Sequence, residues 1–82
     1  MTLHIRIFPI AGLCDQKRDM EIILNEGSMD ELMVQLRERL KADRINTEAL
    51  TFMQNGRAMD LSKDVVFQDG DELWLMPLLS GG

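Results

Sequence analysis

Cysteine and histidine are almost absent from this sequence of 82 residues, which contains one of each, Cys14 and His4. A single cysteine excludes an internal disulfide and is typical of the reducing cytoplasm, where we expect the protein to act. The same scarcity excludes the usual structural zinc sites, which take four ligands from these two residue types. The length allows one small domain with a thin core and no deep, multi-layered active site.

Long hydrophobic runs are also missing. No apolar segment approaches the roughly 18–20 residues of a membrane helix, and residues 1–6 alternate between apolar and polar, unlike a secretory signal. Basic residues are fewer than acidic ones, 9 against 14, and the net charge is −5. This balance disfavours nucleic acid, whose binding depends mainly on clustered lysine and arginine. We therefore expect a non-catalytic domain with locally basic protein partners, no nucleic acid and no membrane.

Alternating apolar residues and turn signals divide the chain into short strands and one helix. Asn55-Gly56 is a strong signal for a two-residue hairpin, and Glu26-Gly27 and Asp69-Gly70 mark further turns. The pattern predicts strands over residues 3–8, 18–25, 50–54, 57–59 and 71–76. Residues 60–67 are expected to form a loop with room for one helical turn.

The helix is expected to begin at Ser28, which forms a capping box with Glu31. In this motif the Ser28 hydroxyl accepts a hydrogen bond from the Glu31 amide, and the Glu31 carboxylate accepts one from the Ser28 amide. The apolar residues recur at the spacing of one buried face and are Leu32, Leu36 and Leu40, flanked by Met29 and Met33. The helix is expected to end near Ala42 or Asp43.

The predicted order is strand, strand, helix, strand, strand, strand. One helix with a single apolar stripe covers one face of one sheet, which predicts an α+β fold of two layers. The sheet is expected to be mixed, with the last strand in its centre beside the first. Residues 1–77 are expected to form this domain, and residues 78–82 a flexible tail.

Few residues offer catalytic chemistry. Cys14 would have to lie beside His4 to form a nucleophile–base pair, and a loop thiol with a surface histidine fits the sequence better. Asp69-Gly70-Asp71 supplies too few oxygens for calcium and is expected to be a tight turn. No glycine-rich phosphate loop precedes the helix. We therefore expect no metal and no cofactor bound by this chain.

The most informative segment is the last one, Pro77-Leu78-Leu79-Ser80-Gly81-Gly82. Proline cannot extend a strand ladder, so the residues after it are expected to leave the sheet. From Leu78 to Gly82 an extended chain reaches about 16–18 Å, and glycine passes through channels too narrow for any Cβ. Such a tail can deliver its carboxylate to a partner's active site, where the poorly electrophilic anion needs activation, for example as an acyl-adenylate. The alternative is a frayed tail without a purpose.

Three segments together resemble the β-grasp sulfur carriers, which are the small subunit of molybdopterin synthase and the sulfur carrier of thiamine synthesis. The segments are Met53-Gln54-Asn55-Gly56-Arg57, Asp69-Gly70-Asp71-Glu72-Leu73 and Ser80-Gly81-Gly82. The resemblance covers nearly the whole chain and implies a ubiquitin-like β-grasp fold. Length and the opening strand are more similar to the molybdopterin-synthase branch. That branch often has two prolines before the tail, and this sequence has only Pro77 there, which leaves the pathway open.

The resemblance implies a carrier cycle with partner enzymes. An adenylating enzyme of the ubiquitin-activating type would use its own ATP and magnesium to join the Gly82 carboxylate to AMP, with Gly81 serving passage. A sulfurtransferase or cysteine desulfurase would then leave a thiocarboxylate on Gly82. The large subunit of molybdopterin synthase would accept the sulfur, or thiazole synthase in the alternative pathway. Further alternatives are a ubiquitin-like modifier of lysines and an interaction domain whose tail does nothing.

Strand phase predicts a docking surface for these enzymes, because alternate residues of a strand face opposite sides of a sheet. The helix side is expected to take Leu50, Phe52, Leu73 and Leu75. The open side is expected to take Met53, Trp74 and Met76. Exposed tryptophan and methionine are enriched at the centres of interfaces. We expect partner contacts from these three side chains and from Leu78, Leu79 and Ser80, unless the register is reversed and Trp74 belongs to the core.

Overall fold

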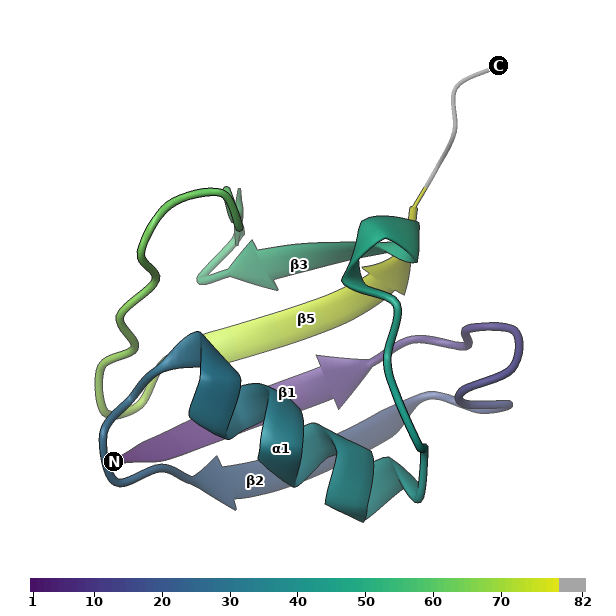
Figure 1. The fold of residues 1–82 in the computed structure, drawn as a ribbon, viewed down its shortest axis with the longest axis horizontal. Helices are drawn as coiled ribbons and strands as arrows, with labels where there is room; N and C mark the ends of the chain where they lie inside the picture. Colours follow the sequence, from purple (N-terminus) through teal and green to yellow (C-terminus); the bar gives the residue numbers. More distant parts are fainter. Residues whose placement is uncertain (79–82) are drawn as a thin grey trace.

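The computed structural model describes residues 1–78, which form a five-stranded sheet with one α-helix packed against it (Figure 1). In chain order the elements are β1 (Thr2–Ile7), β2 (Arg18–Ile23), α1 (Met29–Leu40), the 3₁₀-helix η1 (Thr47–Ala49), β3 (Leu50–Gln54), β4 (Arg57–Ala58) and β5 (Glu72–Pro77). The predicted α+β class and order of strands and helix are confirmed. Across the described residues, none of the helices combines the length and the hydropathy needed to cross a membrane.

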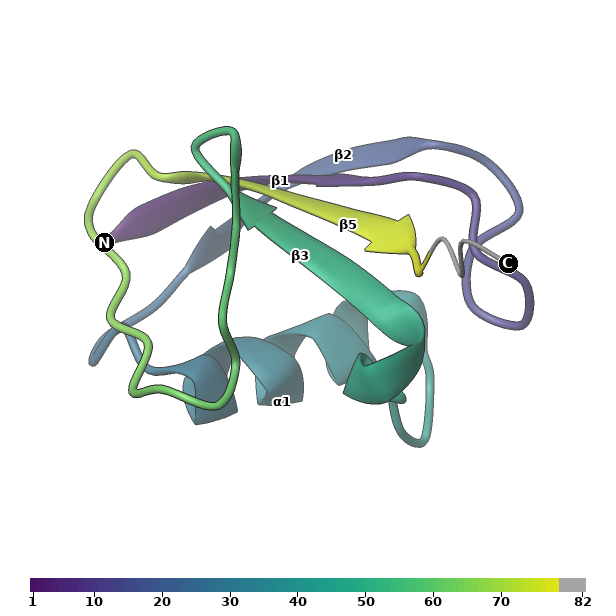
Figure 2. The same cartoon turned by 90° about the horizontal axis from the view of Figure 1, so that it is seen from above.

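The sheet is mixed and has the strand order β2-β1-β5-β3-β4. β1 and β5 are parallel neighbours, whereas β1 with β2, β3 with β5 and β3 with β4 are antiparallel pairs. The last strand therefore lies in the centre beside the first, as predicted. Figure 2 shows α1 against one face of the sheet, and no helix of residues 1–78 covers the opposite face.

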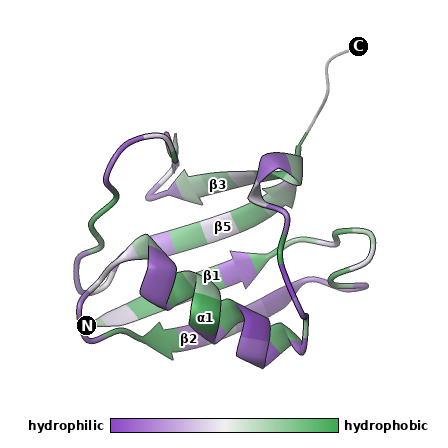
Figure 3. Ribbon diagram, in the orientation of Figure 1, coloured by the Kyte–Doolittle hydropathy of each residue, from purple (hydrophilic) through white to green (hydrophobic). Residues whose placement is uncertain are grey.

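The core lies between α1 and the sheet. Its fully buried side chains include Leu3, Ile7, Ile22, Leu24, Leu32, Leu36, Phe67, Leu73 and Leu75. The predicted helix stripe is confirmed, since Leu40 and the two flanking methionines also pack against this cluster. In Figure 3, hydrophobic and hydrophilic residues alternate along α1, as in a helix with one buried face.

The start of α1 contains half of the predicted capping box. The Glu31 amide donates to the Ser28 hydroxyl at 3.1 Å, but the prediction that the Glu31 carboxylate reaches the Ser28 amide is wrong. That carboxylate instead accepts from the amides of Asn25, Glu26 and Gly27, at 2.6, 2.9 and 3.1 Å. These bonds, with the Asn25 amide foremost, lower the pKa of Glu31. The left-handed Gly27, with φ of 73°, turns the three amides toward one acceptor.

The predicted start of α1 at Ser28 is confirmed, since Ser28 is its N-cap, but the end of α1 and the position of the short helical turn differ from the prediction. α1 ends at Leu40 rather than near residue 42 or 43, because Lys41 adopts the left-handed conformation (φ 53°) that usually signals glycine. The Ala42 amide then donates to the Arg37 carbonyl at 3.0 Å and closes the helix. The only short helical turn of the described residues is η1, so the turn foreseen within 60–67 is absent. The Asn46 side chain caps η1 by accepting from the Glu48 amide.

The predicted strand ends are correct to within two residues. One of the differences, at Pro77, has a clear physical reason. The last strand is predicted to end before Pro77, but β5 includes this residue, which pairs with Leu50 of β3. Proline removes only its own N–H from a ladder. The next amide, of Leu78, donates to the Ala49 carbonyl at 3.0 Å, so the pairing continues one residue further.

Candidate functional site

The face of the sheet opposite α1 carries the side chains that strand phase assigned to docking. The expected phase is confirmed, because the partners on the helix side are buried, namely Leu50, Phe52, Leu73 and Leu75. Trp74 keeps 38% of its surface exposed, and Met53 and Met76 are partly exposed. The reverse register is therefore excluded. We call this open side of the sheet the outer face.

Trp74 lies in the middle of the outer face, in a row that crosses three strands. It pairs with Arg6 of β1 on one side and with Met53 of β3 on the other. The Arg6 guanidinium carbon lies 5.8 Å from the centroid of the indole ring. Phe8 meets the ring edge-on, with centroids 5.6 Å apart and an interplanar angle of 65°. These contacts hold the indole in one orientation while more than a third of it remains in solvent.

Asp19 of β2 holds the guanidinium that stacks on Trp74. The Arg6 Nε donates to Asp19 Oδ1 at 2.8 Å, and Nη2 lies 3.5 Å from Oδ2. This hydrogen bond raises the pKa of Arg6 and lowers the pKa of the Asp19 carboxyl. Asp19, Arg6 and Trp74 therefore form a chain of contacts that presents a rigid aromatic side chain, which is the kind of residue that anchors protein interfaces.

An apolar hollow lies beside this chain, at the end of β5. It measures about 300 Å³ and is lined by Phe8, Thr51, Met76, Pro77 and Leu78. Leu78 is 54% exposed although its amide is bonded to the sheet. The hollow therefore opens where the chain leaves β5. The other tail residues assigned to the site lie outside the described residues and are Leu79, Ser80, Gly81 and Gly82.

Phe8, Thr51, Arg6 and Asp19 were not among the predicted site residues. Strand phase alone could have identified Phe8 and Thr51, since they alternate with buried residues of β1 and β3. The role of Asp19 could not be found in this way. It depends on the register in which β2 pairs with β1 and places Asp19 beside Arg6.

The Asn55-Gly56 and Asp69-Gly70-Asp71 turns are bonded to each other at the opposite end of β5. Asn55 and Gly56 have positive φ angles of 49° and 84°, as the predicted hairpin requires. The buried Asp71 carboxylate accepts from Asn55 Nδ2 (2.9 Å), Gln54 Nε2 (2.8 Å) and the Gln68 amide (2.8 Å). Burial raises the pKa of Asp71, but these three bonds outweigh it and the pKa is lowered.

The Asp71 bonds explain why the acidic turn is structural. Its oxygens are already occupied by protein donors, and residues 1–78 contain no group of three or more histidine, cysteine or acidic side chains placed to hold a metal ion. The pair considered for nucleophilic catalysis also has separate partners. His4 Nδ1 lies 3.3 Å from a Glu21 carboxylate oxygen, and the buried Cys14 thiol donates to the Gln16 carbonyl.

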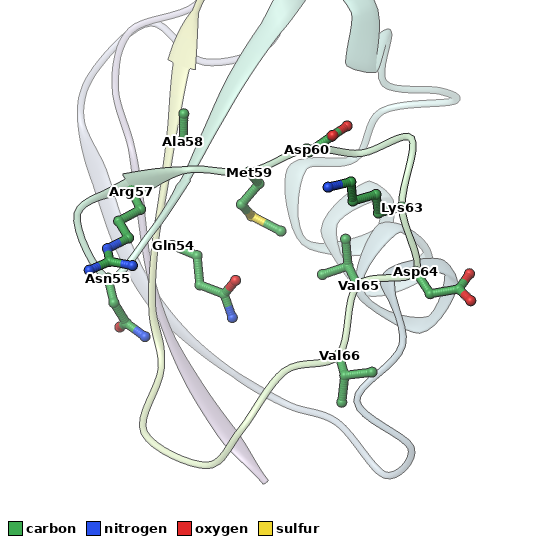
Figure 4. A pocket seen from close by; sticks show the side chains of 10 residues that line it. All are labelled: Gln54, Asn55, Arg57, Ala58, Met59, Asp60, Lys63, Asp64, Val65 and Val66. Atoms are coloured by element: carbon green, nitrogen blue, oxygen red, sulfur yellow. The ribbon is translucent and has the colours of Figure 1, made fainter.

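A second groove, of about 600 Å³, lies between β4 and the following loop, and the sequence did not indicate it (Figure 4). Its apolar residues are Ala58, Met59, Val65 and Val66. Its charged residues balance, because Arg57 and Lys63 are matched by Asp60 and Asp64. The groove therefore favours no ligand of one charge, and we assign it no role in the site.

Comparison with known proteins shows a similarity at the level of the fold. No family model matches the sequence, and no curated protein does. Among solved structures, the crystal structure of SAMP1 from Haloferax volcanii is similar, with a TM-score of 0.72 and 21% sequence identity over 100% of both chains. At this identity the similarity defines the fold. The chain therefore has the β-grasp fold that it shares with SAMP1 over its whole length.

Proposed function

We propose that this protein is a non-catalytic, ubiquitin-like sulfur carrier whose Gly82 carboxylate is adenylated and then converted to a thiocarboxylate. The observation that carries the proposal is the course of β5. This single strand leads from Trp74 and Met76 on the outer face, past the apolar hollow, into the segment that ends in Gly81 and Gly82. A partner that docks on the outer face thereby receives the tail at a defined point.

The dimensions suit delivery of the tail. The chain leaves the sheet at Leu78, and five residues from Leu78 to Gly82 span about 16–18 Å when extended. The domain has principal extents of 36, 25 and 19 Å, so it stays outside while the tail reaches a buried active site. The glycines at the end need no more space than a backbone.

The chemistry divides into three displacements. The Gly82 carboxylate attacks the α-phosphorus of ATP on the adenylating enzyme, and pyrophosphate leaves, which gives an acyl-adenylate. A persulfide on a sulfurtransferase or cysteine desulfurase then attacks the carbonyl carbon, and AMP leaves. The resulting acyl disulfide is reduced by a second thiol, which forms a new disulfide and releases the thiocarboxylate. Magnesium and ATP are bound by the adenylating enzyme, and this chain binds no cofactor. We place this cycle in the cytoplasm.

For the pathway we propose the synthesis of molybdopterin, the molybdenum cofactor, with this chain as the small subunit of the synthase beside a large catalytic subunit that accepts the sulfur. The support is the resemblance of length and opening strand to that branch. The alternative carrier role is sulfur donation through thiazole synthase in thiamine synthesis or another sulfur-insertion pathway. The alternative outside the carrier class is a ubiquitin-like modifier, which would use the same adenylate to acylate a lysine.

Intact-mass spectrometry tests the proposal in a reaction with a ubiquitin-activating-type enzyme, ATP, magnesium and a persulfide donor. We expect the chain to become heavier by the difference between one sulfur and one oxygen atom, and a chain lacking Gly82 to remain unchanged while keeping its circular dichroism spectrum. An isopeptide adduct on a lysine would support the modifier instead. Absence of any change with all components present contradicts both.

A further inference from the structure

The two edges of the sheet differ in length, and β2 is the longer one, with six residues against two in β4. Met1 and Leu24 exchange both backbone hydrogen bonds at 2.8 Å. Because bonded and non-bonded pairs alternate in an antiparallel ladder, Asp19, Glu21 and Ile23 direct their N–H and C=O groups away from β1. Ile23 is also 66% exposed. Such an edge is a template for another strand.

Two side chains of α1 occupy this edge. Gln35 Nε2 donates to the Ile23 carbonyl at 3.1 Å, and Arg39 Nη2 donates to the Glu21 carbonyl at 3.3 Å. The spacing explains why both bonds form. Four residues advance a helix by about 6 Å, and two residues advance a strand by about 6.6–6.8 Å. Helix positions i and i+4 therefore match successive outward carbonyls of the strand.

We propose that the β2 edge is a strand-addition surface whose partner is a second copy of this chain, and that Gln35 and Arg39 keep it closed. An antiparallel pairing of β2 with its own copy, centred on Glu21, places Asp19 opposite Ile23 of the copy. All three outward-facing residues then meet outward-facing residues, which allows about six backbone hydrogen bonds around a two-fold axis. In the monomer two of the three acceptors are already taken, so this ladder cannot form.

Charge supports the closed state. Self-pairing sets Glu21 opposite Glu21 of the copy, and like charges directly opposite each other are destabilising. His4, which lies 3.3 Å from Glu21, is the neighbouring titratable group on β1. The charge effect is screened by salt, whereas the two hydrogen bonds from α1 depend on it much less. The inference depends on the backbone geometry of the β2 edge and on the two side-chain hydrogen bonds from α1, and it is independent of the proposed function.

The test is the mass of Gln35→Ala/Arg39→Ala in solution, measured by sedimentation equilibrium in about 0.5 M sodium chloride, where the Debye length is about 4 Å. We expect the wild type at the 9.4 kDa of one chain and the double variant at twice that mass. Arg37→Ala is the matched control, because Arg37 lies in the same helix and makes no side-chain hydrogen bond to β2 among residues 1–78. Gln35→Met/Arg39→Met keeps the apolar part of both side chains and removes their hydrogen-bond donors. This variant replaces Gln35→Ala/Arg39→Ala in the same measurement if the latter does not fold.

A third substitution locates the interface. Glu21→Pro removes an outward N–H and no bond to β1, which an edge strand tolerates. Added to Gln35→Ala/Arg39→Ala, it is expected to restore the mass of one chain. The proposal is overturned if the folded double variant stays monomeric, or if it dimerises equally well with Glu21→Pro present.

Discussion

Replacing Trp74 with alanine separates docking from folding, because Trp74 and Leu75 are neighbours on β5 that face opposite sides of the sheet. Leu75 is 0% exposed, so Leu75→Ala leaves a cavity and is expected to lower the free energy of unfolding by about 2–5 kcal/mol. Trp74→Ala removes only contacts on the outer face of the sheet. The comparison of two adjacent residues keeps backbone position and strand environment nearly constant.

The magnitude for Trp74→Ala follows from its two ring contacts. The edge-on contact with Phe8 at 5.6 Å contributes about 0.5–1.5 kcal/mol. The contact with the exposed Arg6 at 5.8 Å contributes about 0.5–1 kcal/mol. We therefore expect these two contacts to account for a loss of about 1–2.5 kcal/mol, in addition to the contribution of the apolar area that the partly buried ring removes from water. A chain of 82 residues has a total stability of about 4–12 kcal/mol, so the variant should remain folded.

Urea unfolding followed by far-ultraviolet circular dichroism measures the stability, and calorimetric titration with a ubiquitin-activating-type enzyme measures docking. As an interface anchor Trp74 should contribute at least about 2 kcal/mol to binding, which is about a 30-fold loss of affinity. Val66→Ala is the control, because Val66 is 71% exposed in the loop after β4 and should change neither quantity. A stability loss as large as that of Leu75→Ala, or an unchanged affinity in the folded variant, refutes the assignment of the outer face.

The remaining predictions concern the bonds that hold the fold. Asp71→Asn replaces an acceptor of three hydrogen bonds and should lower the free energy of unfolding by about 1–3 kcal/mol in urea titrations. The pKa values of Asp71 and Glu31 are lowered on folding. The two ionised carboxylates therefore stabilise the fold fully above their unfolded-state pKa values, which lie near 4, and this stabilisation is lost as the pH falls through their folded-state pKa values. Glu31→Gln should make the free energy of unfolding fall less steeply with decreasing pH, as measured in acid unfolding curves. Gly27→Ala should lower the melting temperature more than Gly12→Ala, since both have positive φ but only the new Cβ at Gly27 comes within 2.6 Å of Met1 Cε.

The sequence predicts the parts of the fold that depend on local pattern. Alternation in residues 3–7 and 71–76, the hairpin at Asn55-Gly56 and the leucine stripe of α1 each follow from period and turn chemistry, and all are confirmed. The errors occur where a residue acts against its usual preference. Lys41 takes a left-handed angle that favours glycine, and Pro77 stays in a strand because its missing N–H leaves the rest of the ladder intact.

The candidate site could be predicted only in part, for a related reason. The exposure of Trp74 and Met76 follows from strand phase along one segment. The contacts that orient the indole do not, because Asp19, Arg6 and Phe8 reach it through the pairing of β2 with β1 and of β1 with β5. Glu31 shows the same limit, since its three amide partners depend on how the chain turns between β2 and α1. Register between distant segments is a property of the packed fold.

The most direct test of the account follows the oxygen atoms of the Gly82 carboxylate. A tail peptide with a heavy-oxygen-labelled carboxylate is ligated to the folded domain, and the chain is then turned over with the adenylating enzyme, ATP and the sulfur donor in ordinary water. If that carboxylate is the reagent, the released AMP carries one labelled oxygen and Gly82 carries sulfur. Unlabelled AMP with sulfur-free Gly82 would contradict the account.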